Sequence, residues 1–180
     1  MVCGVPVCVI RAGESGMSEK IDFSTIRFLV VDSNRLFLDM IKDVLNMMGA
    51  ATILRAPDVE KAKKLLREDS IDVLITEWTL EGQSGMELLH HIRTSADSPN
   101  RMLPVVMLTA NSEENYVLAA RDHGVTEFLA KPFTVQSFYD RLVSVIARPR
   151  AFVDAESYFG PDRRRRQTEF SGPDRRQAAS

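Results

Sequence analysis

Apolar residues recur along the chain in two alternating patterns. Short, nearly continuous apolar runs have the composition of strands that are buried on both faces of a parallel sheet. Longer stretches carry apolar residues every three or four positions, the spacing of a helix that covers a sheet. The runs predict strands at Ile26–Val31, Ala51–Arg55, Ile71–Thr76, Pro104–Thr109 and Val125–Ala130, and the stretches predict helices at Arg35–Met48, Asp58–Glu68, Gly85–Thr94, Glu113–Asp122 and Thr134–Ala147.

Residues that commonly begin or end helices support these boundaries. Gly49 and Gly124 each follow a helical stretch, where glycine often ends a helix. Pro57 and Asp58 begin the second helix, and Ser112 precedes two acidic residues that favour a helix N-terminus. Five β-α units in succession predict an α/β fold with a doubly wound, parallel, five-stranded sheet and right-handed crossovers.

Composition is typical of one soluble domain. Of the 180 residues, 44% are apolar, yet no run approaches the roughly 18–20 apolar residues of a membrane span. The two cysteines, Cys3 and Cys8, are too few for a zinc site or a disulfide framework. The apolar opening lacks the basic start of a secretory signal. We therefore expect a cytoplasmic protein without membrane contact, translated from Met1 or Met17.

Charge and patterning change near residue 148. Residues 148–180 hold eight Arg and five acidic residues, a net charge of +3, so the remainder of the chain, at a total of −2, carries −5. An acidic body is not typical of a nucleic-acid-binding protein. We expect a domain at residues 24–148, with disordered segments at 1–23 and 149–180.

A short sequence occurs twice in the C-terminal segment. An aromatic residue, any residue and then Gly-Pro-Asp-Arg-Arg stand at Tyr158–Arg164 and, twelve residues later, at Phe170–Arg176. Pro and Asp after Gly favour turns, and the segment has too few apolar residues for a core of its own. We expect a disordered, basic tail whose partner the sequence does not identify.

Polar residues follow the predicted strands, at the edge where parallel α/β sheets bind ligands. Four segments in this order resemble the receiver domains of two-component response regulators: FLVVDS, DVLITEWTLEGQSGMELL, PVVMLTA and EFLAKPFT. The resemblance covers about Thr25–Ala147. It implies a flavodoxin-like (βα)5 fold with strand order 2-1-3-4-5.

The resemblance also implies roles for individual residues. In the family, a carboxylate after the third strand accepts a phosphoryl group, two acids after the first strand help to hold Mg²⁺, and a Thr and a Lys bind phosphoryl oxygens. Thr109 and Lys131 stand at the last two positions, and Phe128 at that of the switch aromatic. Asp32 retains one of the paired acids.

Two positions depart from the family pattern. Glu77 stands at the phosphoacceptor position and Ser33 at that of the second acid. The extra methylene displaces the carboxylate by about 1.5 Å, and a misplacement of about 1 Å can slow a reaction on the order of 100-fold. Without a carboxylate at Ser33, Mg²⁺ binding by Asp32 and Glu77 should be weak, so no cofactor is required. We expect Glu77 to form an ion pair with Lys131.

We therefore expect a stand-alone signalling protein of the two-component or phosphorelay type that is not an enzyme. It would act independently of phosphorylation, by docking through the face of the fourth helix, fifth strand and fifth helix. Its partner would be a histidine kinase or another regulator. Whether Glu77 fixes an active-like state or an inert one stays open.

Two other functions also stay open. A working phosphoacceptor would function in a phosphorelay despite Glu77, and the run Arg163–Arg166 could bind RNA or an anionic surface. A nucleotide-dependent enzyme is disfavoured, because the turn after the first strand has no glycine to cradle a phosphate.

Overall fold

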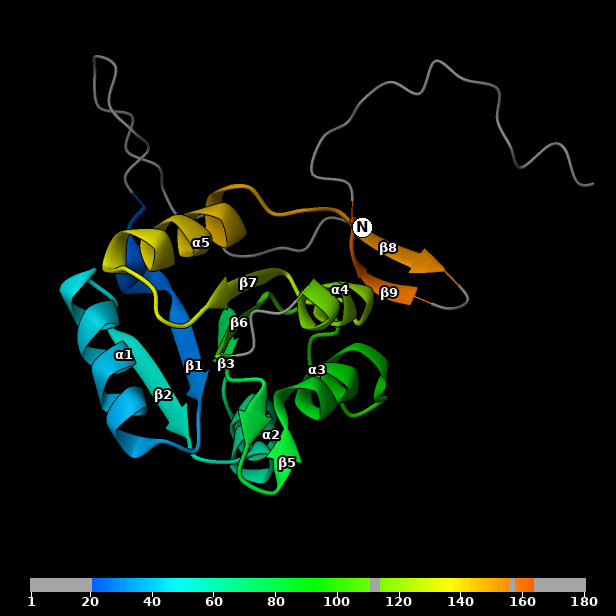
Figure 1. Cartoon of the computed structure of the whole chain (residues 1–180), viewed down its shortest axis with the longest axis horizontal. Helices are drawn as coiled ribbons and strands as arrows, with labels where there is room; N and C mark the ends of the chain where they lie inside the picture. The colour runs from blue at the N-terminus through cyan, green and yellow to red at the C-terminus, as the bar shows by residue number, and fades with distance from the viewer. Residues whose placement is uncertain (1–20, 111–113, 156–157, 164–180) are drawn as a thin grey trace, which may run out of the picture.

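The computed structural model describes residues 21–110, 114–155 and 158–163. A five-stranded parallel sheet forms its centre, in the order β2-β1-β3-β6-β7 (Figure 1). The strands of this sheet are β1 Arg27–Val31, β2 Thr52–Ala56, β3 Val73–Thr76, β6 Val105–Thr109 and β7 Glu127–Ala130. The helices are α1 Arg35–Met47, α2 Val59–Glu68, α3 Gly85–Thr94, α4 Glu114–Asp122 and α5 Val135–Ala147.

The predicted fold class and strand order are confirmed. β6 and β7 are the fourth and fifth strands of the sheet in chain order, so the observed arrangement is 2-1-3-4-5. α3 has the predicted bounds, and the other predicted elements differ by one or two residues at one end or, for β2, by one residue at both ends. Hydrophobic periodicity sufficed here because each element is long enough to show its period.

Local hydrogen bonds explain where the helices begin and end. The Asn34 side chain accepts hydrogen bonds from two amides at the start of α1, and the Asp58 carboxylate accepts one from the Lys61 amide. Thr134 and Ser137 form a reciprocal capping box at the start of α5. Gly49, after α1, has a φ of 96°, which favours glycine. The predicted cap at Ser112 lies outside the described residues.

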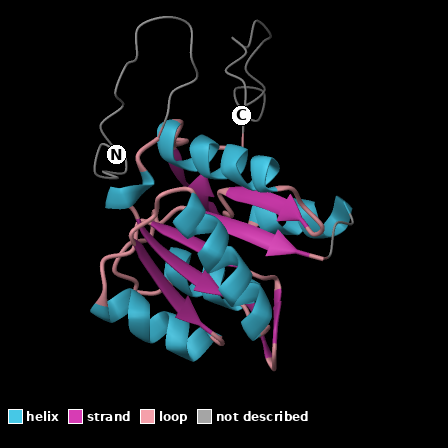
Figure 2. Ribbon diagram, turned by 90° about the vertical axis from the view of Figure 1, so that its left-hand side faces the viewer, coloured by secondary structure: helices cyan, strands magenta, loops and turns pink. Residues whose placement is uncertain are grey.

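The helices cover both faces of the sheet (Figure 2). One buried cluster joins the sheet to α1 and α5, and it includes Ile41, Leu45, Phe138 and Leu142. The other joins the sheet to α2, α3 and the described part of α4, and it includes Leu66, Leu88 and Ile92. Two apolar faces thus hold the strands in register, with their carboxyl ends at one edge.

Strand register brings the residues of the predicted site to that edge. Val31 pairs with Thr76, the last residues of β1 and β3, and Thr109 pairs with Ala130, the last residues of β6 and β7. The residue that follows each strand therefore lies beside the residue that follows its neighbour. The strand register of the sheet therefore brings the site residues close together.

The body extends beyond both predicted boundaries. Ile21 and Phe23 are buried, and a 3₁₀ turn spans Phe23–Thr25, so the packed structure begins before residue 24. The first 20 residues lie outside the described part. The prediction that the chain is disordered from residue 149 is wrong for two short strands, β8 Phe152–Ala155 and β9 Tyr158–Pro161, which pair antiparallel.

The hairpin packs on the body at the ends of α3 and α4 (Figure 1). Arg93, at the end of α3, lies with its guanidinium 5.1 Å from the centre of the Phe152 ring, and Arg101 lies 4.0 Å from that of Phe159. Sequence analysis missed this element because its contacts come from a distant part of the chain. Residues 164–180, the rest of the predicted tail, lie outside the described residues.

A second, smaller hairpin follows β3. It consists of β4 Thr79–Leu80 and β5 Gln83–Ser84, and its turn contains Gly82 with a φ of 72°. None of the described helices is long and apolar enough to span a membrane.

Candidate functional site

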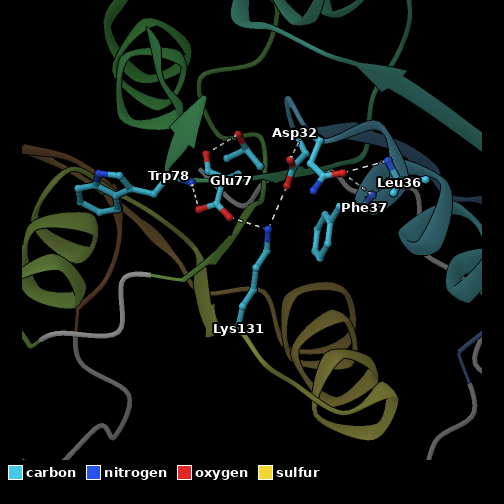
Figure 3. Close-up of polar contacts among 8 residues, drawn as sticks. Asp32, Leu36, Phe37, Glu77, Trp78 and Lys131 are labelled. Carbon is cyan, nitrogen blue, oxygen red and sulfur yellow. Dashed lines mark hydrogen bonds and ion pairs between the residues drawn. The ribbon is translucent and has the colours of Figure 1, made fainter. Parts of the chain in front are cut away.

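Three of the predicted site residues meet at the carboxyl edge of the sheet. Asp32 follows β1, Glu77 follows β3 and Lys131 follows β7 (Figure 3). The Lys131 ammonium lies 3.0 Å from Asp32 Oδ2 and 2.5 Å from Glu77 Oε2. The expected ion pair between Glu77 and Lys131 is therefore present, and Asp32 shares the same ammonium.

The three charged groups are largely shielded from solvent. The side chain of Lys131 is 20% exposed, and those of Asp32 and Glu77 are 5% and 11% exposed. Shielding strengthens the attraction between the charges but also removes their hydration, and the two effects largely cancel. The triad therefore fixes the geometry of the pocket more than it stabilises the fold.

Backbone amides hold the other carboxylate oxygens. The Asn34 amide donates to Asp32 Oδ1 at 2.8 Å, and the Trp78 amide donates to Glu77 Oε1 at 2.7 Å (Figure 3). Each carboxylate thus accepts one hydrogen bond from the main chain and faces Lys131 with its second oxygen. Such paired contacts to ionised groups are stronger than neutral hydrogen bonds and orient the carboxylates.

An aromatic ring lies against the ammonium. Lys131 Nζ lies 3.4 Å from the centre of the Phe37 ring, a cation–π contact, and Phe37 belongs to the first turn of α1 (Figure 3). Sequence analysis did not single out Phe37, since it reads there as one more apolar residue of the helix. Only the position of α1 beside the loop after β7, where the Phe37 and Phe133 ring centres lie 6.3 Å apart, brings it to Lys131.

A glycine allows the loop after β3 to close. A Cβ on Gly85 would lie 2.0 Å from the Glu77 carbonyl oxygen, too close for any other residue. The Gly85 amide donates to the Trp78 carbonyl at 2.8 Å, and Thr76 Oγ1 donates to the Glu77 carbonyl at 3.1 Å. These contacts fix the backbone that carries Glu77.

The remaining predicted residues lie around this triad in different environments. Thr109 is buried at the end of β6, between β3 and β7 in the sheet. Ser33 is exposed and lines a separate hollow with Arg35 and Arg55. Phe128 is half-buried on β7 and packs against the apolar cluster on the side of α2 and α3. The switch roles predicted for Thr109 and Phe128 stay predictions.

The arrangement fits Mg²⁺ poorly. Magnesium requires near-octahedral coordination by oxygen, usually from one or two free carboxylates and water. Here all four carboxylate oxygens of Asp32 and Glu77 face a hydrogen-bond or ion-pair donor, and an ammonium occupies the space between them. Within the described residues, no cluster of three or more His, Cys, Asp or Glu side chains is arranged to hold a metal ion.

A shallow hollow marks a second face beside the pocket. It has a volume of about 610 Å³, and its lining includes Val117, Phe128, Phe133 and Arg141, from α4, β7, α5 and the loop after β7. Val135, at the start of α5, is 54% exposed. This is the face of the fourth helix, fifth strand and fifth helix that sequence analysis predicted to dock a partner.

The fold and the pocket define a class of protein domain: a doubly wound α/β domain with two carboxylates and a lysine at the carboxyl ends of its strands. Comparison with known protein families supports this class. Residues 28–143 match the model of the response regulator receiver domain. The chain belongs to the response regulator receiver domain family and is a receiver domain of two-component signalling.

Individual relatives cover the same part of the chain. The chemotaxis protein CheY of Pseudomonas aeruginosa is 30% identical over 123 residues, which is 68% of this chain and 98% of the relative. The chemotaxis protein CheY1 of Helicobacter pylori is 31% identical over 122 residues, 67% of this chain and 97% of the relative. A putative response regulator from Chloroflexus aurantiacus has a TM-score of 0.62 at 28% identity, covering 69% of this chain and all of that structure.

Proposed function

We propose that this receiver domain signals by docking to another protein and does not accept a phosphoryl group on Glu77. The supporting observation is the ammonium of Lys131, shared between Glu77 and Asp32 at 2.5 and 3.0 Å. A receiver lysine that binds phosphoryl oxygens must be available to them. In this pocket the Glu77 carboxylate occupies the place where an added anion would meet the ammonium.

The side-chain length of Glu77 supports the same conclusion. Its carboxylate already accepts the Trp78 amide and faces Lys131, so attack on a phosphodonor would first require both contacts to break. The pocket also offers a poor site for Mg²⁺, the cation that would offset repulsion between a carboxylate and a phosphate. Phosphoryl transfer is therefore slow, and no cofactor is required.

The docking surface is the face formed by α4, β7 and α5. Phe128, Phe133 and Arg141 are among the residues that line its hollow, and exposed Val135 follows the lining residue Thr134 in the chain. Partly exposed aromatic side chains beside an arginine are typical of protein interfaces. The partner is a signalling protein such as a histidine kinase or another regulator, in the cytoplasm, and the domain performs no catalytic step of its own.

Phosphorylation by a small phosphodonor tests the proposal. Wild-type chain and the double variant Glu77→Asp/Ser33→Asp are incubated with acetyl phosphate and Mg²⁺ and measured by intact-mass spectrometry. We expect the mass of one phosphoryl group to be added to the double variant but not to the wild type. Stoichiometric labelling of Glu77 in the wild type would refute the proposal and favour a working phosphorelay receiver.

Photo-crosslinking in the native cells tests the docking face separately. A crosslinking residue at Val135 should capture a signalling protein, whereas the same residue at Met47, a 75% exposed position on α1, should not. Equal capture at both positions would contradict docking through α4, β7 and α5.

A further inference from the structure

The Gly-Pro-Asp-Arg-Arg sequence occurs twice in the chain, and its first copy packs on the body of the domain. Residues 158–163 of the first copy form β9 and the two residues after it, packed at the ends of α3 and α4 (Figure 1). The second copy, Phe170–Arg176, lies outside the described residues. The contacts of the first copy show which of its residues the body recognises.

Two glycine backbones meet at the centre of this contact. A Cβ on Gly160 would lie 2.7 Å from Gly124 Cα, and a Cβ on Gly124 would lie 2.8 Å from the Phe159 carbonyl oxygen. Both distances are shorter than real Cβ contacts allow, so neither position admits another residue without movement. Gly160 and Pro161 are buried here. We call the surface around Gly124, Asp122 and Arg93 the Gly124 site.

The arginine of the repeat reaches an acidic residue of α4. Arg163 Nη1 lies 3.2 Å from Asp122 Oδ1, and its guanidinium lies 4.2 Å from the centre of the Tyr158 ring. An aromatic residue and an arginine thus stack on each other while the arginine pairs with the body. The side chains of Arg163 and Asp122 are both partly exposed, so their ion pair adds little binding free energy. Its main effect is to favour a peptide that has arginine at this position.

The second copy retains the residues that make these contacts. It has an aromatic residue at Phe170, glycine at Gly172 and arginine at Arg175, each twelve positions after its counterpart. It differs at two places. Phe170 lacks the hydroxyl with which Tyr158 donates to the Pro161 carbonyl, and Ser171 replaces the Phe159 ring that lies beside Arg101.

We infer that the Gly124 site is a recognition site for the sequence aromatic-x-Gly-Pro-Asp-Arg, and that Phe170–Arg176 is a second ligand for it within the same chain. The second copy pairs with β8 in place of β9, with Gly172 opposite Val153 as Gly160 is now. Backbone hydrogen bonds of an antiparallel pair do not depend on side-chain identity, so the exchange preserves them.

The two copies differ in strength. Loss of the tyrosine hydroxyl and of the Phe159–Arg101 contact makes the second copy at least about tenfold weaker. β9 therefore holds the site in the wild-type chain. Once β9 is displaced, the second copy refills the site, because a short tether gives it an effective concentration on the order of millimolar.

A spin label at the C-terminus tests the exchange in the full-length chain. The label is attached to Ser180→Cys after Cys3 and Cys8 are changed to Ser, and NMR measures paramagnetic broadening of the Gly124 amide. Gly160→Val disables the first copy, because its side chain would meet Gly124. We expect several-fold stronger broadening than in the parent, and a return to the parent level when Gly172→Val is added.

If Gly160→Val and the double glycine variant broaden Gly124 equally, the inference is overturned. Amide resonances of the five-stranded sheet report in each variant whether the body is folded. A second measurement adds a synthetic peptide of residues 165–180 to the full-length double variant. Saturable shifts of the Gly124 amide are expected, and the same peptide with Gly172→Val should cause none. Shifts of equal size with both peptides would also refute recognition.

Discussion

Two shielded cations at opposite edges of the sheet make a direct comparison. Lys131 lies at the carboxyl edge between the carboxylates of Asp32 and Glu77. Arg93 lies near the other edge, is only 2% exposed and donates hydrogen bonds to the carbonyl oxygens of Gly124, Arg101 and Leu103. The first cation is held by charge and the second by directed hydrogen bonds.

The difference follows from the shapes of the two side chains. An ammonium is a compact charge that two carboxylates can share, whereas a guanidinium is a planar fork whose several N–H groups each need an aligned acceptor. Lys131 therefore suits a pocket in which charge is exchanged or shared. Arg93 suits a structural junction, where it joins α3, the segment before β6, the loop before β7 and the ring of Phe152.

Removing the pocket cation should have the largest effect. Lys131→Met leaves two shielded carboxylates facing each other without a counter-charge, so we expect a loss of about 3 kcal/mol of unfolding free energy. Urea unfolding, with the slope m compared between variants, measures the loss. The exposed Lys61→Met on α2 is the matched control and should change stability little. Equal losses of unfolding free energy at both positions would show that Lys131 stabilises the fold no more than an exposed lysine does.

Arg93→Lys tests whether the directed hydrogen bonds of Arg93, and not its charge, hold the junction together. The lysine retains the charge but not the fork, so several buried carbonyl contacts are lost and we expect a loss of about 2 kcal/mol. The β8–β9 hairpin should also exchange its amide hydrogens faster. Arg67→Lys, an exposed position on α2, serves as control. Unchanged stability and unchanged hairpin protection would mean that charge alone suffices at position 93.

Tyr158→Phe tests whether the hairpin junction depends on single hydrogen bonds. The variant removes the 2.7 Å hydrogen bond to the Pro161 carbonyl, and we expect a loss of about 1 kcal/mol in hairpin stability. Hydrogen exchange of the β8 and β9 amides is the measurement. Protection equal to that of the wild type would contradict this dependence.

Glu77→Gln should have the smallest effect on folding. Glutamine can still accept the Trp78 amide, and Asp32 still pairs with Lys131, so removal of one charge should change the unfolding free energy by less than about 1 kcal/mol. Urea unfolding measures it, with the exposed Glu81→Gln as control. A loss as large as that of Lys131→Met would show that the Glu77 pair is a main source of stability.

Much of the pocket could be predicted from sequence. Asp32, Glu77 and Lys131 each follow an apolar run, and parallel strands place such residues at one edge. The longer reach of glutamate then predicted the contact with Lys131. Phe37 and the amide of Trp78 could not be predicted, because a ring or an amide acquires its role only from the residue that it faces.

The hairpin shows the opposite case. Its strands are short, and Gly160, Pro161 and Asp162 read as turn-forming residues, so no local pattern indicates β structure. Contacts with Gly124 and Arg93 hold it on the body, and both lie at least 28 residues before the start of β8 in the chain.

By itself, the sequence determined the order of strands and helices, the edge at which the charged residues gather and the ion pair of Glu77. These features follow from hydrophobic periodicity and from the connectivity of β-α units, which are local or nearly local properties. Tertiary structure alone decided how Lys131 is shared, which ring supports it and where β8 and β9 pack. Those outcomes depend on distances between residues far apart in the chain, and such distances are set only when both faces of the sheet are covered.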